Sequence, residues 1–541
     1  MDRSALFTNG RIYTLEREGE CYSALRVGPD GRIAQLYRDG ADVPPQMARN
    51  IPRTDLGGRT VVPGFIDSHV HFMAKVAFGA LGVNLARLEG DRIVPDSLDQ
   101  IRLLLAERIA QSPGPILGYG LCLGAVAERR LPWASELDAW FPGKDILILS
   151  MDGHSSSYSS PVLKKLGISA LAQDGLLTGT AHEFNMGKIS AFLMNRLTPA
   201  VLVRGFRTVV DEAARNGVVS LHCLEGTEDP STDPALLLFK LVGGRLGLRL
   251  KLWMQYTALE RARRHVRSLA YPRAGGCLAW EMDGSVSSRS AAFDRPYLDR
   301  PDAGREYRSP EQALALVRPF YDAGWQTTAH AIGPRGIESI LSAYERVMSD
   351  GGDGENRLRL RIDHFEFPRP DQIERAGRLG LVLAVQPGFA WADDRFVHTY
   401  REALAPEVRA AQCPLRSLVD AGCVVSLSTD SPVQPLYPFL QILGAVDHPI
   451  AAHRLSRYEA LRAYTYNGAY AAFEEHERGS LGIGKYADFV LLDADPFAVE
   501  TERLRSIQVL GTWREGLPLT APPGSVLGFA ARVLRTQPRK L

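Results

Sequence analysis

The chain has 541 residues, which is too many for one compact hydrophobic core, so we expect at least two domains. Its 63 Lys and Arg residues nearly balance 62 Asp and Glu residues, which excludes a protein that binds nucleic acid or acidic membranes through a basic surplus. The sequence also lacks an apolar run of transmembrane length, a signal-peptide pattern and a disulfide framework. We therefore expect a cytoplasmic protein with no nucleic-acid or membrane partner.

The first informative element is the stretch "VVPGFIDSHVHF" at Val61–Phe72, which has the composition of a short buried strand. Residues two apart in a strand project from the same face, so His69 and His71 would point the same way. Two imidazoles at that separation can bind one divalent metal ion. Two unrelated histidines beside a loop are the alternative, so the metal interpretation requires ligands elsewhere in the chain.

Further strand-like runs follow, and amphipathic stretches separate most of them. These runs are 217–225, 248–256, 276–285, 325–333, 359–367, 381–389 and 424–432. Strands that alternate with helices predict parallel βαβ units. Together with 61–72 they number eight, which predicts an α/β fold of the TIM (β/α)8 barrel type.

Several polar residues lie near the C-terminal ends of these predicted strands. They are His69, His71, His330, His364 and Asp430. Because strand ends of a TIM barrel converge on one mouth, these residues predict a site for one or two divalent ions, with zinc as the expected metal. Taken singly, His330 and His364 could be core histidines, and Asp430 could cap the next helix. Five such coincidences at four strand ends are a weaker explanation than a shared metal site.

Sequence motifs along nearly the whole chain resemble the amidohydrolase superfamily, specifically amidohydrolase family 3. They are "GRTVVPGFIDSHVHF", "DGHSSSYSSPVLKKLGI", "MDGSVSSRSAAF", "TAHAIGPRG", "RIDHFEF", "PLRSLVDAGCVVSLSTDSPVQPL", "EALRAYTYNGAYAAFEE" and "GSLGIGKYADFVLLDADP". The resemblance implies a small β-sandwich built from both termini, residues 1–62 and 479–520. The barrel would occupy residues 63–478, with a large insertion at about 75–205, and residues 521–541 would form a C-terminal tail.

The resemblance also implies roles for residues outside the predicted strand ends. His154 would point into the active site as a ligand of the substrate or transition state, although "DGHSSS" could equally be a polar turn. The family usually has a carbamylated lysine that bridges two metals, and Ala279 occupies that position here. Glu281 is our first candidate for a replacement bridge, followed by a single metal without a bridge and then by Cys223. A salt bridge from Glu281 to Arg289 or another cation is the structural alternative.

These features predict a metal-dependent hydrolase that cleaves a C–N, amide-type bond of a small organic substrate with a metal-activated water. Asp430 would act as general base and then acid, and His154 or His364 would stabilise the oxyanion. Arg289 and Arg335 could hold a substrate carboxylate or could be structural pairs. A heterocycle deaminase with one metal and a non-catalytic binding protein are the competing functions. The sequence leaves open whether the chain forms a homodimer.

Overall fold

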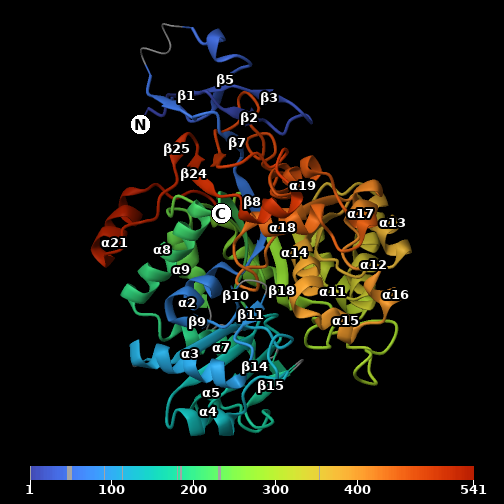
Figure 1. Ribbon diagram of the computed structural model, residues 1–541. Helices are drawn as coiled ribbons and strands as arrows, with labels where there is room; N and C mark the ends of the chain where they lie inside the picture. Colours follow the sequence, from blue (N-terminus) through green and yellow to red (C-terminus); the bar gives the residue numbers. More distant parts are fainter. Residues whose placement is uncertain are drawn as a thin grey trace.

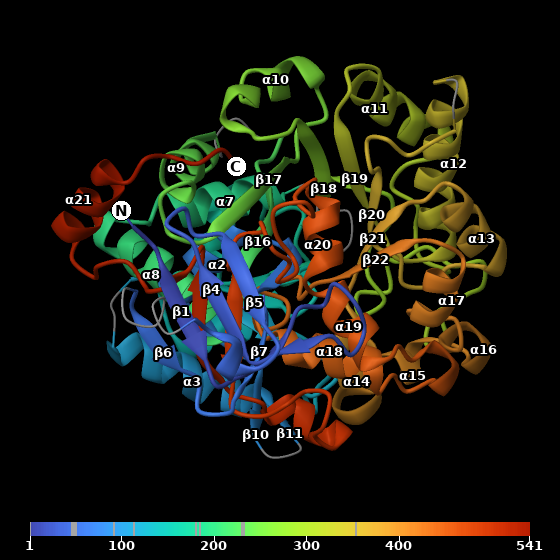
Figure 2. The same cartoon turned by 90° about the horizontal axis from the view of Figure 1, so that it is seen from above.

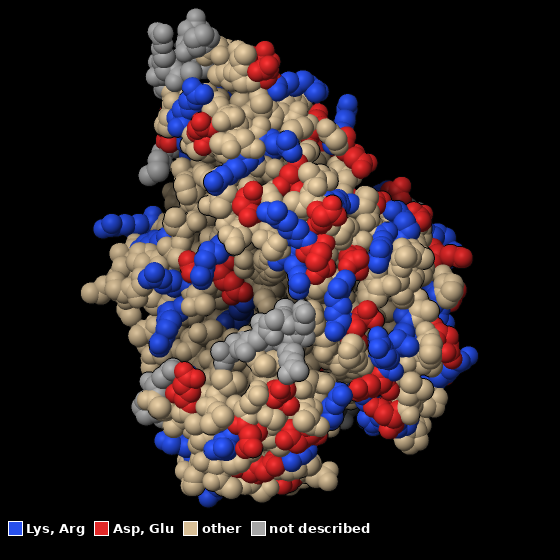
Figure 3. Space-filling model, viewed as in Figure 1, with Lys and Arg blue, Asp and Glu red and all other residues tan. Residues whose placement is uncertain are grey.

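The computed structural model describes residues 2–44, 51–89, 92–111, 114–178, 181–182, 185–228, 233–351 and 354–541. Figure 1 shows three parts: sheets from both ends of the chain at the top, a barrel in the middle and a further sheet with helices below. Basic and acidic side chains are intermixed over the face seen in Figure 3, in keeping with the small net charge. Within the described ranges, no helix is both long and apolar enough to cross a membrane.

Among the described residues, eight parallel strands form the central sheet. In spatial order they are β8 (Phe65–Val70), β16 (Val218–Glu225), β17 (Arg249–Met254), β18 (Arg273–Glu281), β19 (Gln326–Ala331), β20 (Arg361–His364), β21 (Val382–Val385) and β22 (Val424–Leu427). Figure 2 shows strands β16 to β22 from above. A parallel bridge between Val70 and Ser431 links the two edges of this sheet. The predicted eight-stranded parallel barrel is therefore confirmed.

Helices surround the barrel, and the longer ones bury an apolar face. In α12 (Pro334–Asp350), the buried residues Ile337, Ile340, Leu341 and Tyr344 follow the i, i+3, i+4, i+7 spacing of one helix face. The other outer helices are α8 (Pro199–Arg215), α9 (Asp233–Gly243), α10 (Leu259–Arg263), α11 (Pro310–Asp322), α13 (Pro370–Arg378), α14 (Pro387–Ala392), α15 (Thr399–Ala403), α16 (Pro406–Arg409), α17 (Leu415–Asp420), α18 (Pro438–Val446), α19 (Arg457–Ala463) and α20 (Tyr466–Ala471).

Strands from the two ends of the chain pair with one another. One sheet has the order β25 (Leu517–Pro518), β24 (Val509–Arg514), β23 (Phe489–Leu492), β7 (Thr60–Pro63), β2 (Arg11–Tyr13) and β3 (Cys21–Tyr22). A second sheet has the order β5 (Ile33–Tyr37), β4 (Ala24–Val27), β1 (Ala5–Thr8) and β6 (Arg53–Asp55). Phe7 of the second sheet packs edge-on against Phe489 of the first, with ring centroids 4.9 Å apart. This apolar contact holds the two sheets together.

The chain between β8 and β16 builds a separate sheet with its own buried clusters. This sheet has the order β15 (Leu176–Thr178), β14 (Ser155–Tyr158), β13 (Ile146–Ser150), β12 (Ile116–Leu121) and β9 (Gly82–Asn84). The same segment holds α2 (Phe72–Leu81), β10 (Arg87–Glu89), β11 (Arg92–Val94), α3 (Leu98–Gln111), α4 (Ala134–Trp140), α5 (Ser160–Leu166) and α7 (Met186–Met194).

The C-terminal residues pack against the barrel. Helix α21 (Val526–Arg535) lies on α8, where the Phe529 and Phe206 rings stack with centroids 5.8 Å apart. Beyond this helix, Arg539 forms an ion pair with the buried Glu515, and the Leu541 side chain is buried. The basic tail is thus attached to the folded protein at its very end.

Strand β18 is irregular where it approaches the barrel mouth. Its register with β19 passes from Gly276–Ala329 directly to Glu281–His330, so residues 277–280 form a bulge. Gly275 precedes the bulge with φ +108°, a conformation that L side chains rarely adopt. A Cβ atom added to Gly275 would lie 1.9 Å from the carbonyl oxygen of Thr328. Glycine at 275 is therefore required by both backbone conformation and space.

We expect Gly275→Ala to lower the free energy of unfolding by roughly 3 kcal/mol or more, because backbone strain and a steric clash combine. Gly324→Ala is the matched control, since Gly324 also has positive φ (+75°) but nothing lies within 4 Å of its added Cβ. The control should lose only about 1–2 kcal/mol. Urea unfolding followed by circular dichroism measures both, and equal losses would contradict the clash.

Candidate metal centre

The five ligands predicted from the barrel strands lie together. His69 belongs to β8, His330 to β19 and His364 to β20. His71 comes immediately after β8, and Asp430 lies three residues after the end of β22. All except the fully buried His69 line one cavity of about 240 Å³. This is the C-terminal end of the strands, where barrel proteins place their active sites.

His69, His71 and Asp430 form the first group of potential ligands. The Oδ1 atom of Asp430 is 3.1 Å from His69 Nε2 and 3.3 Å from His71 Nε2. Zinc–ligand bonds of about 2.0–2.3 Å place the ligand atoms of a tetrahedral ion roughly 3.3–3.8 Å apart. Small adjustments of these side chains would therefore let the group hold one ion.

A second group consists of Cys277, His69 and His364, and it contains a residue that the sequence analysis did not single out. The Cys277 sulfur lies 3.6 Å from His69 Nε2 and 3.8 Å from His330 Nδ1. Ala279, the position matched to the family lysine, is only half-buried, and its carbonyl accepts a hydrogen bond from Arg308. Counting back from the "DGS" motif did not find Cys277 because the bulge in β18 breaks the regular alternation of side chains.

Glu281 belongs to a third group, with His154 and His330. One of its carboxylate oxygens accepts a hydrogen bond of 2.9 Å from the amide of Leu278. The alternative of a salt bridge from Glu281 to Arg289 is wrong, because Arg289 pairs with Asp299 at 2.6 Å. Glu281 thus lies beside two other potential ligands.

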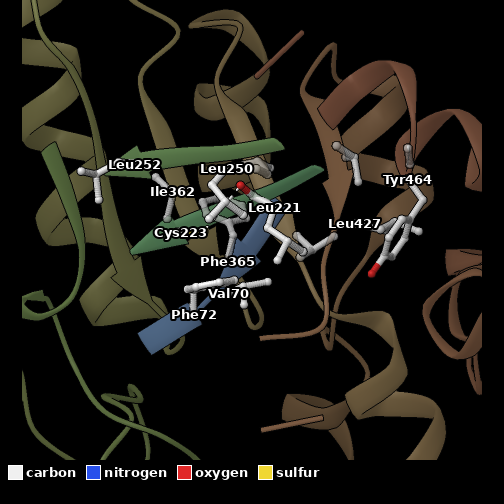
Figure 4. Close-up of a cluster of buried hydrophobic side chains, with 14 of the residues drawn as sticks. Val70, Phe72, Leu221, Cys223, Leu250, Leu252, Ile362, Phe365, Leu427 and Tyr464 are labelled. Atoms are coloured by element: carbon white, nitrogen blue, oxygen red, sulfur yellow. Dashed lines mark hydrogen bonds between the residues drawn. The ribbon is translucent and has the colours of Figure 1, made fainter. Parts of the chain in front are cut away.

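Cys223, the third-ranked candidate bridge, lies away from these groups. It points into the apolar cluster drawn in Figure 4, where Leu250, Leu252 and Ile362 are also found. Its sulfur is 3.6 Å from the carbonyl oxygen of Leu221, and burial raises the pKa of its thiol well above the usual value. The structure therefore assigns Cys223 to packing and contradicts its proposed place at the metal site.

Neighbouring polar groups fix which nitrogen each histidine presents. Asp363 Oδ2 is 3.2 Å from His69 Nδ1, which leaves Nε2 of His69 facing Asp430. Gln386 accepts a hydrogen bond of 2.8 Å from His364 Nδ1, which leaves Nε2 of His364 available. The Gln386 orientation is itself fixed, since its NH2 group donates to Ser428 and to the Ala384 carbonyl. Such contacts orient metal-binding imidazoles in many proteins.

Electrostatics favour a positive charge at this centre. Burial lowers the pKa of His69, but the carboxylates of Asp430 and Asp363 outweigh burial and raise this pKa well above its usual value. For the acid Asp430, burial raises the pKa, but the neighbouring His69 and His71 outweigh burial and lower this pKa well below its usual value. Asp430 is therefore a carboxylate, and the group attracts a cation, whether a proton on His69 or a metal ion.

The backbone at two of these residues is unusual. His364 has φ +72° and Asp430 has φ +55°, both in the left-handed region that few non-glycine residues occupy. Strained backbone of this kind persists where the surrounding structure holds it, and it is concentrated at functional sites. This backbone conformation sets the directions in which the two side chains leave the main chain.

His154 reaches the barrel mouth from the inserted segment. One oxygen of Asp152 accepts hydrogen bonds of 2.6 Å from both Ser285 and Ser288, which follow β18. These bonds hold the "DGHSSS" loop against the barrel, and the rings of His154 and His330 lie 5.7 Å apart. Two distant sequence motifs therefore meet at the cavity, as the functional interpretation of His154 requires.

The cavity walls combine apolar side chains with carboxyl groups. The apolar lining includes Met73, Ala77, Phe78, Leu193, Val286 and Phe389, and the acidic lining includes Asp152, Glu225, Glu281, Glu366 and Asp430. Lys and Arg are absent from the described lining residues. Arg289 and Arg335, considered above for binding a substrate carboxylate, are paired with Asp299 and Glu306. Burial raises the pKa of Glu225 to about 8, so this carboxyl group is largely neutral at pH 7.

The chain is similar in sequence and in fold to known proteins. The chain is 29% identical to the protein LONG AFTER FAR-RED 3 of Arabidopsis thaliana, over 95% of this chain and 91% of that protein. It is 25% identical to an N-substituted formamide deformylase of Arthrobacter pascens, over 95% and 98% of the two chains. A metal-dependent hydrolase from Pyrococcus horikoshii OT3 has a similar fold, with a TM-score of 0.70 and 22% identity over 92% and 99% of the chains.

The sequence model that describes the amidohydrolase family matches residues 54–519. This match includes the barrel, the segment inserted after β8 and the C-terminal strands β23 to β25. Because it spans most of the sequence, the chain belongs to the amidohydrolase family.

Proposed function

We propose that this protein is a metal-dependent hydrolase that cleaves a C–N, amide-type bond in a small organic substrate. The observation that carries the proposal is the convergence of His69, His71, His330, His364 and Asp430 beside a largely apolar cavity at the barrel mouth. Membership of the amidohydrolase family supports hydrolysis, and the relative named N-substituted formamide deformylase supports a C–N bond as the target.

The donor set suits zinc, which binds imidazole, carboxylate and thiolate groups. We assign His69, His71 and Asp430 to one ion. His330 and His364 would serve a second ion, and Glu281 lies close enough to His330 to contribute a carboxylate. A bound ion of this type supplies a water activated at neutral pH and polarises a substrate carbonyl.

Asp430 is suited to proton transfer because it lines the cavity and its carboxylate is ionised. It would accept a proton from the attacking water and pass it to the leaving nitrogen. His154, held over the mouth by the Asp152 contacts, would donate a hydrogen bond to the oxygen that becomes negative as the carbonyl is attacked. His364 is the alternative donor for that oxygen.

The lining of the cavity favours neutral, largely apolar amides. Carboxyl groups from Asp152 and Glu281 face a cavity whose described lining contains no Lys or Arg. A substrate carboxylate would meet like charge there and would find no basic partner. An apolar group would instead be removed from water against the Phe78 and Phe389 side chains.

We expect the zinc-loaded protein to release amine from neutral N-substituted formamides or amides. Within matched pairs, an N-acyl amino acid amide should have a kcat/KM at least roughly tenfold above that of the free acid, because one unfavourable charge contact is removed. Amine release measured by chromatography checks this. A preference for the free acid would contradict the inferred substrate class, and ammonia release from a heterocycle would favour a deaminase.

Asp430→Asn removes the proton acceptor while keeping the side-chain shape. We expect kcat to fall by roughly 10²–10⁴, the usual contribution of general acid–base catalysis. Metal content and circular dichroism are measured on the same samples, and Asp420→Asn at an exposed site is the control. A loss of only two- or threefold would place the base elsewhere.

Asp363→Asn tests the contact that orients His69. The amide should hold the imidazole less firmly, so we expect metal affinity to fall by about 10–100-fold, as for other residues that orient metal ligands. Competition with a chelator measures the affinity, and the exposed Asp371→Asn is the control. An affinity equal to that of the wild type would remove Asp363 from this role.

A further inference from the structure

The most informative residue outside the predicted ligand set is Cys277. Its sulfur lies near His69 of the first ligand group and near His330 and His364 of the other side of the centre. Resting on the proposed function, we infer that Cys277 is the ligand shared by two metal ions. A thiolate would thereby take the place that the family resemblance gives to a carbamylated lysine.

The backbone is built to present this sulfur. The amide of Cys277 donates a hydrogen bond of 2.9 Å to Gln255, and the Gln255 NH2 group donates to the carbonyl of Gly226. Gly276 before it has φ +138° and Leu278 after it has φ +54°. Together these features turn the chain at Cys277 so that its side chain lines the cavity. The backbone before and after Cys277 therefore holds its side chain in the candidate centre.

The surrounding histidines leave the required atoms facing this sulfur. His330 Nε2 is 3.3 Å from the carbonyl oxygen of Gly284, which leaves Nδ1 directed at Cys277. His69 presents Nε2, because Asp363 occupies its Nδ1 side. The sulfur therefore lies within 4 Å of a potential ligand atom from each side of the centre. This is the position that a shared ligand needs.

Glu281 is placed differently. It is grouped with His154 and His330, whereas Cys277 is grouped with His69 and His364. One Glu281 oxygen accepts the hydrogen bond from Leu278, the residue after Cys277. Its contact therefore supports the turn that presents the cysteine, and Cys277 is better placed than Glu281 to reach ions on both sides.

The binding step balances without a further reactant. The S–H bond of Cys277 breaks, its proton passes to solvent and the sulfur electron pairs form bonds to the ions. Thiolate is among the common zinc ligands, with Zn–S distances of about 2.3 Å. Because no carbamate is formed, loading of the second ion should not depend on bicarbonate.

X-ray absorption spectroscopy at the zinc edge tests the inference on the full-length, zinc-loaded protein. We expect a sulfur neighbour of zinc at about 2.3 Å in the wild type. The control variant Cys21→Ser should show the same signal, because Cys21 lies in β3 of the six-stranded sheet and not in the barrel. Cys277→Ser should lose this sulfur signal, and its zinc content should fall from two equivalents towards one. A wild type with only nitrogen and oxygen neighbours, or a sulfur signal that survives in Cys277→Ser, would overturn the assignment.

The variant Glu281→Gln tests Glu281 as the competing bridge. We expect this variant to retain the sulfur signal. If instead Glu281→Gln loses the second ion and Cys277→Ser keeps it, the bridging role belongs to Glu281. These readouts do not depend on turnover, so a failure to hydrolyse amides would refute the proposed function alone.

Discussion

The contact between His69 Nδ1 and Asp363 Oδ2 is the constraint on which the centre depends. It leaves only Nε2 of His69 for the cavity side, where both Asp430 and Cys277 lie within reach. Asp363 can remain ionised although it is fully buried, because Arg361 donates a hydrogen bond of 2.5 Å to its other oxygen. A buried ion pair thus maintains the direction of an imidazole at the strand end.

The barrel and most of the potential ligands could be predicted from the sequence because regular spacing determines them. His69 and His71 lie two residues apart at the end of one predicted strand, and His330, His364 and Asp430 each lie near the end of another strand-like run. Parallel strands bring their C-terminal ends together whatever the intervening sequence, so residues far apart in the chain could be placed at one mouth.

Irregular backbone explains what could not be predicted. The bulge in β18 removes the relation between sequence interval and side-chain direction, so counting from Asp283 led to Ala279 and missed Cys277. The apolar surroundings of Cys223 depend on packing between strands and helices, which a single run of letters does not specify. The ion pairs of Arg289 and Arg335 likewise join residues whose proximity only the folded chain determines.

The bulge also offers a way to recognise related chains. Two glycines precede Cys277, and Asp283 of the "DGS" motif follows it after five intervening residues, so the pattern G-G-C-x5-D-G-S encodes both the turn and its cysteine. Sequences with this pattern would form a subgroup distinguishable from those with the lysine spacing, even where overall identity is low. Genome surveys that sort the family by this interval would thus separate cysteine-bridged centres from lysine-bridged ones by their sequences alone.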